Sequence, residues 1–161
     1  MRKRIQTIIV SLIAVLCLAG YSINSLAGYS INTFSSITND PKAVQPTMKD
    51  ALKYKQTTLI LVSSKCPDCK RDRTQIINGV KKLRKNGHHV VVFNIDQLQK
   101  KDINYLIDEV PGVSYKTGLA VPTFIDLQSS EEHHFFHATY VLRDKGTASQ
   151  ISSFFERIGE E

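Results

Sequence analysis

Four short apolar runs occur in the part of the chain that follows residue 46, and they predict the strands of a single sheet. They cover residues 57–62 (TTLILV), 89–95 (HVVVFNI), 121–127 (VPTFIDL) and 135–142 (FFHATYVL). The first two are almost continuously apolar, which is typical of strands that are covered on both faces. The last two are separated by a short polar stretch, which favours an antiparallel hairpin.

Between these runs, apolar residues recur at helical spacing and predict three amphipathic helices. Their buried stripes are Ile76, Ile77, Val80 and Leu83, then Ile103, Leu106, Ile107 and Val110, and finally Ile151, Phe154, Phe155 and Ile158. Asn86-Gly87 and Pro111-Gly112 end the first two helices, and Thr147 with Gln150 forms a capping box for the last. With a short helix ahead of the first strand, the order α-β-α-β-α-β-β-α predicts an α/β fold, with a central sheet flanked by helices on both faces.

The N-terminus has the pattern of an export signal. Basic residues at positions 2–4 precede a mostly apolar run, residues 8–19, and small residues at 25–27 (SLA) fit a signal-peptidase site. The apolar run is shorter than the roughly 20 residues of a comfortable membrane span. We expect residues 1–27 to be a signal peptide or, alternatively, an N-terminal anchor tilted through the bilayer. The domain is therefore expected to be extracytoplasmic, in the cell envelope or secreted.

A polar stretch separates this leader from the predicted domain. Residues 28–46 are rich in Ser, Thr and Asn and are predicted to be a linker or a loosely held first strand. Thr47, with Asp50 three residues later, is a capping box for the short first helix, so a single domain is expected over residues 47–161. Cleavage of the leader would halve the formal net charge of +6. The composition therefore gives no strong argument for a nucleic-acid partner, and none is expected.

Cysteine positions indicate the candidate chemistry. Of three cysteines, Cys17 lies in the leader, so an exported domain keeps Cys66 and Cys69, which can oxidise and stay oxidised outside the cytoplasm. A zinc site usually needs four ligands, and this pair supplies two. The histidines, at positions 88, 89, 133, 134 and 137, fit a turn and a hairpin end better than a ligand set. An inert disulfide across so short a loop would constrain the unfolded chain little. We expect a redox-active pair, with no metal and no other cofactor.

The segment KCPDCKR, residues 65–71, lies where the first strand leads into a helix. The first amide groups of a helix lack intrahelical partners, and the helix dipole adds a partial positive charge, so a Cys66 thiolate would be stabilised there. Pro67 fits the first helical position. Cys66 is therefore the predicted nucleophile, and Cys69, one turn later, is the predicted resolving thiol.

Charged side chains around the pair are expected to tune the nucleophile. Lys65, Lys70 and Arg71 are predicted to lower the pKa of Cys66, and Asp68 is predicted to oppose them.

These features resemble the thioredoxin superfamily. Cys66-Pro67-Asp68-Cys69 follows a buried strand, and Val121-Pro122-Thr123 opens a later one; the resemblance covers roughly residues 47–158. It implies a thioredoxin fold in which Pro122 is cis, lies beside the cysteines and helps Val121 to pair with the substrate backbone. Pro67 and Asp68 would then also face the substrate.

Three departures separate the chain from thioredoxins proper. Lys65 stands where these carry a tryptophan, Pro67-Asp68 stands where they have Gly-Pro, and Ile60 lies where they keep a buried acidic residue. The chain is more similar to exported thiol-disulfide oxidoreductases, among them the small thioredoxin-like accessory proteins encoded beside bacteriocin export systems.

The predicted function is an extracytoplasmic thiol-disulfide oxidoreductase. Its partners would be exported cysteine-containing proteins or peptides and an unidentified redox protein that regenerates the pair, with any association with the membrane expected through the N-terminus. Oxidase or isomerase activity is favoured, because Pro67 and Val121 resemble oxidising members and a basic flank stabilises the reduced thiolate. The alternatives are a reductase fed by a membrane donor, a non-catalytic peptide-binding module and a metallochaperone.

Overall fold

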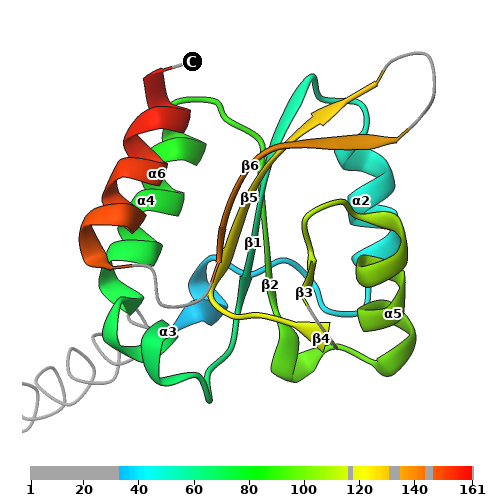
Figure 1. Cartoon of the computed structure of the whole chain (residues 1–161), viewed down its shortest axis with the longest axis horizontal. Coiled ribbons are helices and arrows are strands. Elements are labelled where there is room, and N and C mark those ends of the chain that lie inside the picture. Colours follow the sequence, from blue (N-terminus) through cyan, green and yellow to red (C-terminus); the bar gives the residue numbers. More distant parts are fainter. Residues whose placement is uncertain (1–32, 116–117, 131–134, 144–146, 161) are drawn as a thin grey trace, which may run out of the picture.

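A four-stranded mixed sheet forms the centre of the domain in the computed structural model (Figure 1). Its strands are β1 (Gln56–Val62), β2 (Val90–Asn94), β5 (Thr123–Ser129) and β6 (Phe136–Arg143), in the order β2-β1-β5-β6. β1 is parallel to β2, and β5 is antiparallel to both of its neighbours. All four predicted strands are present within two residues of their predicted ends, and the predicted hairpin is β5–β6.

The structure describes residues 33–115, 118–130, 135–143 and 147–160. The predicted leader, together with His133 and His134, lies outside the described residues. Within the described ranges, no helix is long and apolar enough to span a membrane.

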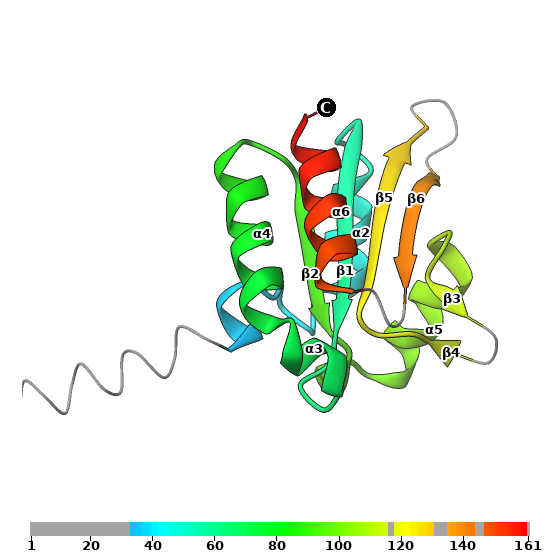
Figure 2. The same ribbon diagram turned by 60° about the vertical axis from the view of Figure 1, so that its left-hand side comes forward.

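Helices cover both faces of the sheet (Figures 1 and 2). On one face α4 (Arg73–Lys85) packs against α6 (Ala148–Glu160), and on the other α2 (Val44–Ala51) packs against α5 (Lys100–Glu109). β1 supplies both cores, because successive side chains of a strand point to opposite faces. Ile60 and Val62 pack on the α4–α6 side, and Leu59 and Leu61 pack on the α2–α5 side. This strand order, with helices on both faces, is the thioredoxin fold that the sequence predicted.

The domain begins earlier than the sequence predicted. A 3-10 helix, η1 (Phe34–Ser36), opens the described chain, and Phe34 and Ile37 are buried in the core beneath α4 and α6. The prediction of a linker over residues 28–46 is therefore corrected for residues 33–46. Burial of these apolar side chains outweighs the polar composition of the segment.

The first helix also begins earlier, at Val44, whose side chain is fully buried. Thr47 lies inside α2, where its amide N–H donates to the Ala43 carbonyl. The capping box predicted at Thr47 and the domain boundary placed there are therefore not what the structure shows. At α6 the predicted capping box does form, because the Thr147 N–H donates to Gln150 Oε1 at 2.8 Å.

Asn39 covers the outer edge of β2. Its N–H donates to the Val92 carbonyl, its side-chain oxygen accepts from the Val92 N–H, and both distances are 2.8 Å. Arg84 Nη2 donates to the Val90 carbonyl on the same edge at 2.9 Å. These contacts satisfy backbone groups that an edge strand otherwise leaves open to another chain.

Three local features of the fold were not predicted. The helix expected after Cys66 is two helices, α3 (Pro67–Arg71) and α4, with a bend at Asp72 between them. A short 3-10 helix, η2 (Ile95–Gln97), follows β2. A two-stranded ribbon of β3 (Ser114–Tyr115) and β4 (Gly118–Leu119) lies between α5 and β5.

Candidate active site

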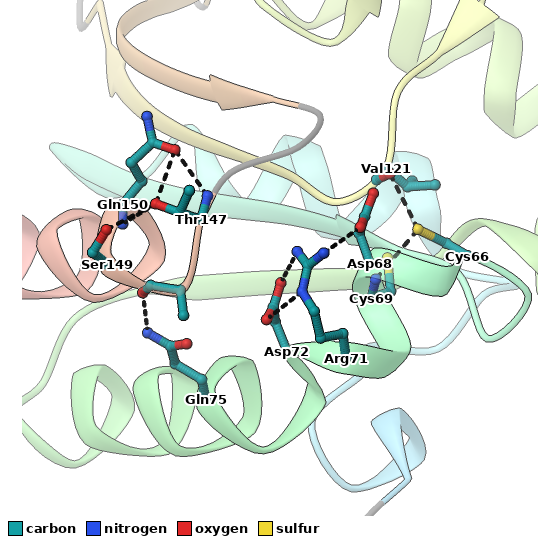
Figure 3. A network of polar contacts seen from close by, with 11 residues as sticks. Cys66, Asp68, Cys69, Arg71, Asp72, Gln75, Val121, Thr147, Ser149 and Gln150 are labelled. Atoms are coloured by element: carbon teal, nitrogen blue, oxygen red, sulfur yellow. Dashed lines mark hydrogen bonds and ion pairs between the residues drawn. The ribbon is translucent and has the colours of Figure 1, made fainter.

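The cysteine pair lies where β1 delivers the chain into α3 (Figure 3). Cys66 is the N-cap of α3, and its Sγ accepts a hydrogen bond from the Cys69 N–H at 3.3 Å. Pro67 takes the first helical turn, as predicted, because its missing N–H would have had no partner there. Both thiols are free. A helix-start amide thus points at the Cys66 sulfur, where it can also serve a thiolate.

The two thiols differ in exposure, and therefore in whether a partner molecule can reach them. Cys66 is half-buried, whereas Cys69 is fully buried in the core beneath α4 and α6. Burial raises the pKa of Cys69 to about 12, so this thiol stays protonated at neutral pH. A partner molecule can therefore meet the sulfur of Cys66, while Cys69 is reached from within the site. The division of the pair into nucleophile and resolving thiol stays a prediction.

The loop before β5 lies against the Cys66 sulfur. The Cys66 thiol donates to the Val121 carbonyl at 3.3 Å (Figure 3). The Val121–Pro122 peptide bond is cis, as the resemblance implied. Pro122 is buried, while Val121 is partly exposed. The Thr123 hydroxyl donates to the Ala120 carbonyl at 2.8 Å, which ties the two sides of this bend together. Val121 and Cys66 come from segments 55 residues apart and meet at one point of the surface.

Arg71 binds two carboxylates beside the pair (Figure 3). Its Nη1 lies 2.7 Å from Asp68 Oδ1, and its Nη2 and Nε donate to the two oxygens of Asp72 at 2.7 and 3.0 Å. Asp72 is only 6% exposed, so this bidentate contact compensates a nearly buried charge. The charge of Arg71 is thus directed at Asp68 and Asp72.

The other basic residues of the motif remain at the surface. Lys65 and Lys70 are exposed on either side of the pair, and their predicted effect on the pKa of Cys66 stays a prediction. The partner of Asp68 was not predicted, although Asp68 and Arg71 are three residues apart on one helix, a spacing at which opposite charges commonly meet.

Two histidines of the described residues lie away from the cysteines. His89 stacks on Tyr54, and its Nδ1 is 3.0 Å from the Thr57 hydroxyl near the start of β1, whereas Cys66 follows the end of that strand. His137 lies exposed on β6. Among the residues that the structure describes, no three His, Cys, Asp or Glu side chains are grouped as metal ligands. The expectation of a metal-free site stays a prediction, since His133 and His134 fall outside these residues.

The reduced protein is expected to lose stability as the pH rises above about 9. An unfolded chain releases the Cys69 proton near pH 9.0, whereas the folded chain keeps it until the pH approaches about 12. The stabilisation is therefore complete below pH 9 and declines between these two values. Urea unfolding of the reduced protein from pH 7 to 10.5 measures the decline. Cys69→Ala is expected to give a shallower decline, and parallel curves for the two proteins would contradict this account.

Comparisons with known proteins add no argument about the fold or the function of this chain. No protein-family model matches the chain, and no curated protein matches it. A solved structure of Trichomonas vaginalis thioredoxin aligns over 75% of this chain and 93% of its own, with 11% identity and a TM-score of 0.47. The fold assignment rests on strand order and helix placement in this chain, not on that likeness. By these criteria the chain is a thioredoxin-fold protein with a Cys-Pro-Asp-Cys pair at the start of α3.

Proposed function

We propose that this protein is an extracytoplasmic thiol-disulfide oxidoreductase that forms or exchanges disulfides in exported cysteine-containing proteins or peptides. The unequal exposure of two thiols within one helical turn carries the proposal: Cys66 is open to a partner and Cys69 is buried beneath it. The cis bend at Val121 beside Cys66 adds a backbone surface along which a peptide can lie. The location rests on the export pattern of residues 1–27.

Disulfide formation in a substrate can be written with atoms and electrons balanced. A substrate thiolate attacks Cys66 Sγ of the oxidised pair, the Cys66–Cys69 bond breaks, and the Cys69 sulfur takes up a proton from water. A second substrate thiolate attacks the substrate sulfur of the mixed disulfide and displaces the Cys66 thiolate. The substrate loses two electrons and two protons, and the reduced pair is left as the Cys66 thiolate and the Cys69 thiol. A redox partner then reoxidises the pair.

Two features support oxidation or isomerisation over reduction. The Cys69 N–H points at the Cys66 sulfur, which favours a negative charge on it. The contact between Arg71 and Asp68 offsets the carboxylate that would oppose that charge. A site that stabilises its reduced, thiolate form is a stronger oxidant.

The reduction potential of the pair tests this proposal. The protein is equilibrated with glutathione or dithiothreitol buffers, with Cys17→Ser as background so that the third cysteine does not contribute. We expect one two-electron transition, and a potential near or above about −150 mV for a disulfide-forming protein. A value below about −250 mV would make the protein a reductase and direct attention to a membrane donor. If no transition occurs, the redox function is wrong and a peptide-binding module takes its place.

A further inference from the structure

A carboxylate from the end of another strand holds the loop that presents Cys66. Three residues, Ser63 to Lys65, connect the end of β1 to Cys66. Asp96 lies in η2, directly after β2, and its Oδ1 accepts from the Ser63 hydroxyl at 2.9 Å. Its Oδ2 accepts from the Ser64 N–H at 2.7 Å. A single side chain therefore binds two consecutive residues of the loop.

Additional hydrogen bonds make this contact part of a closed network. The Lys65 N–H donates to Ser63 Oγ at 3.0 Å, and Asn94 Nδ2 donates to Ser64 Oγ at 2.9 Å. Asn94 Oδ1 in turn accepts from the Asp96 N–H at 3.2 Å. The parallel pairing of β1 with β2 brings the two strand ends to the same edge of the sheet. The network therefore runs from the end of β2 to the residue before Cys66.

The same loop reaches the buried thiol. Ser63 is 4% exposed, and its backbone lies close to the Cys69 sulfur. Burial, the larger effect, raises the pKa of Cys69, and the Ser63 backbone acts against it by favouring the thiolate. The Ser63 side chain is thus held by Asp96, and the Ser63 backbone acts on Cys69.

We propose that Asp96 is a positioning residue for the step in which Cys69 releases a bound substrate, because it holds the Ser63 N–H toward the Cys69 sulfur. The inference rests on the proposed function. In this step the Cys69 thiol gives its proton to water, and its thiolate attacks Cys66 Sγ. The Cys66–Cys69 bond forms, the bond between Cys66 and the substrate sulfur breaks, and the substrate leaves as a thiolate. The pair is oxidised by two electrons and the substrate disulfide is reduced.

Two substitutions of Asp96 distinguish the effect of holding the loop in position from the effect of the negative charge of Asp96. Asp96→Ala removes both acceptors, so Ser63 and Ser64 lose their anchor. Asp96→Asn keeps an oxygen for the Ser64 N–H and can donate its amide to the Ser63 oxygen, so the loop stays held without the negative charge. Asp108→Ala removes an exposed carboxylate from α5 and controls for the loss of charge alone.

The rate of substrate release is the measurement. A mixed disulfide between Cys66 and a cysteine-containing peptide is formed, and its release is followed by acid quench and mass spectrometry from pH 6 to 9. In Asp96→Ala, release is expected to slow roughly fivefold to tenfold, the effect of weakening one hydrogen bond to a charged sulfur. Alkylation of Cys66 by iodoacetamide, which reports the first attack, is expected to change less than about twofold. Asp96→Asn and Asp108→Ala are expected to release the peptide at nearly the original rate.

Distinct results would overturn the proposal. Equal slowing of alkylation and release in Asp96→Ala would indicate general loosening of the loop, and unchanged release would show that Asp96 does not act on Cys69. A loss in Asp96→Asn as large as in Asp96→Ala would assign the effect to charge. Amide hydrogen exchange at Ser63 gives a readout independent of redox chemistry: it is expected to be slow and to accelerate in Asp96→Ala, and no acceleration would refute the positioning. If the unaltered protein forms no mixed disulfide, the proposed function itself fails.

Discussion

Replacing Cys66 by serine is expected to abolish thiol-disulfide exchange. Replacing Cys69 by serine is expected to preserve the attack of Cys66 on a substrate disulfide but to prevent release of the substrate from the mixed disulfide. The Cys66 sulfur is the half-exposed one, and a serine hydroxyl at neutral pH is a far weaker nucleophile than a thiolate. We expect a loss of at least about a thousandfold in Cys66→Ser, the scale seen when a covalent nucleophile is removed. In Cys69→Ser the mixed disulfide has no internal thiol to resolve it, so it accumulates.

The two variants are compared in a Cys17→Ser background, with a peptide that carries one disulfide. Non-reducing electrophoresis and intact mass then show whether the peptide stays attached. Cys69→Ser is expected to trap the peptide, and Cys66→Ser is expected to trap none. A peptide trapped through Cys69 would reverse the roles that burial assigns. No trapping in either variant would favour the peptide-binding alternative.

Local signals predicted most of the secondary structure. The continuous apolar run at 57–62 and the stripe Ile76, Ile77, Val80, Leu83 are buried as expected, because sequence periodicity reports directly which face of an element meets the core. Pro67 at the start of α3 and the capping box at Thr147 were found for the same reason. Each depends on residues within a few positions of one another.

Features that depend on distant partners could not be found in this way. Asn39 reads as one more polar residue of a linker, and its role comes from Val92, 53 positions later. Asp96 follows the strand predicted over residues 89–95, and the Ser64 that it binds lies 32 positions earlier. A sequence shows that such a side chain can accept hydrogen bonds, but the fold decides which donor it meets.

The sequence predicted the cysteines and the cis bend of the candidate site, but not the contacts of the charged residues around them. Cys66, Cys69 and the cis bend at Pro122 come together as the motif and the resemblance implied. The charges around them were harder to assign. Arg71 was expected to act on Cys66, yet it is bound to Asp68 and Asp72, because adjacent carboxylates compete for a cation more strongly than a partly buried thiol does.

Gly79→Ala is expected to destabilise the protein, although alanine normally strengthens a helix. In an exposed helix interior this change gains about 1 kcal/mol. Here a Cβ on Gly79 would lie 2.4 Å from the ring of Phe155, at the contact between α4 and α6. That ring also packs edge-on against Phe124 and Phe154, so moving it would disturb two further contacts of the core. We expect a net loss of about 1–3 kcal/mol in the free energy of unfolding, the usual cost of overpacking a core.

Gly159→Ala is the matched control, because a Cβ there would meet Leu83 at 3.8 Å, an ordinary contact. Both glycines lie on helices of the same pair, so the two variants differ mainly in the space available. Urea unfolding of the reduced proteins is expected to place Gly159→Ala at or above the stability of the unaltered protein, and Gly79→Ala below it. Equal stability of the two variants would mean that α4 and α6 move apart at little cost. The close approach at Gly79 would then be a consequence of the small residue and not a requirement of the fold.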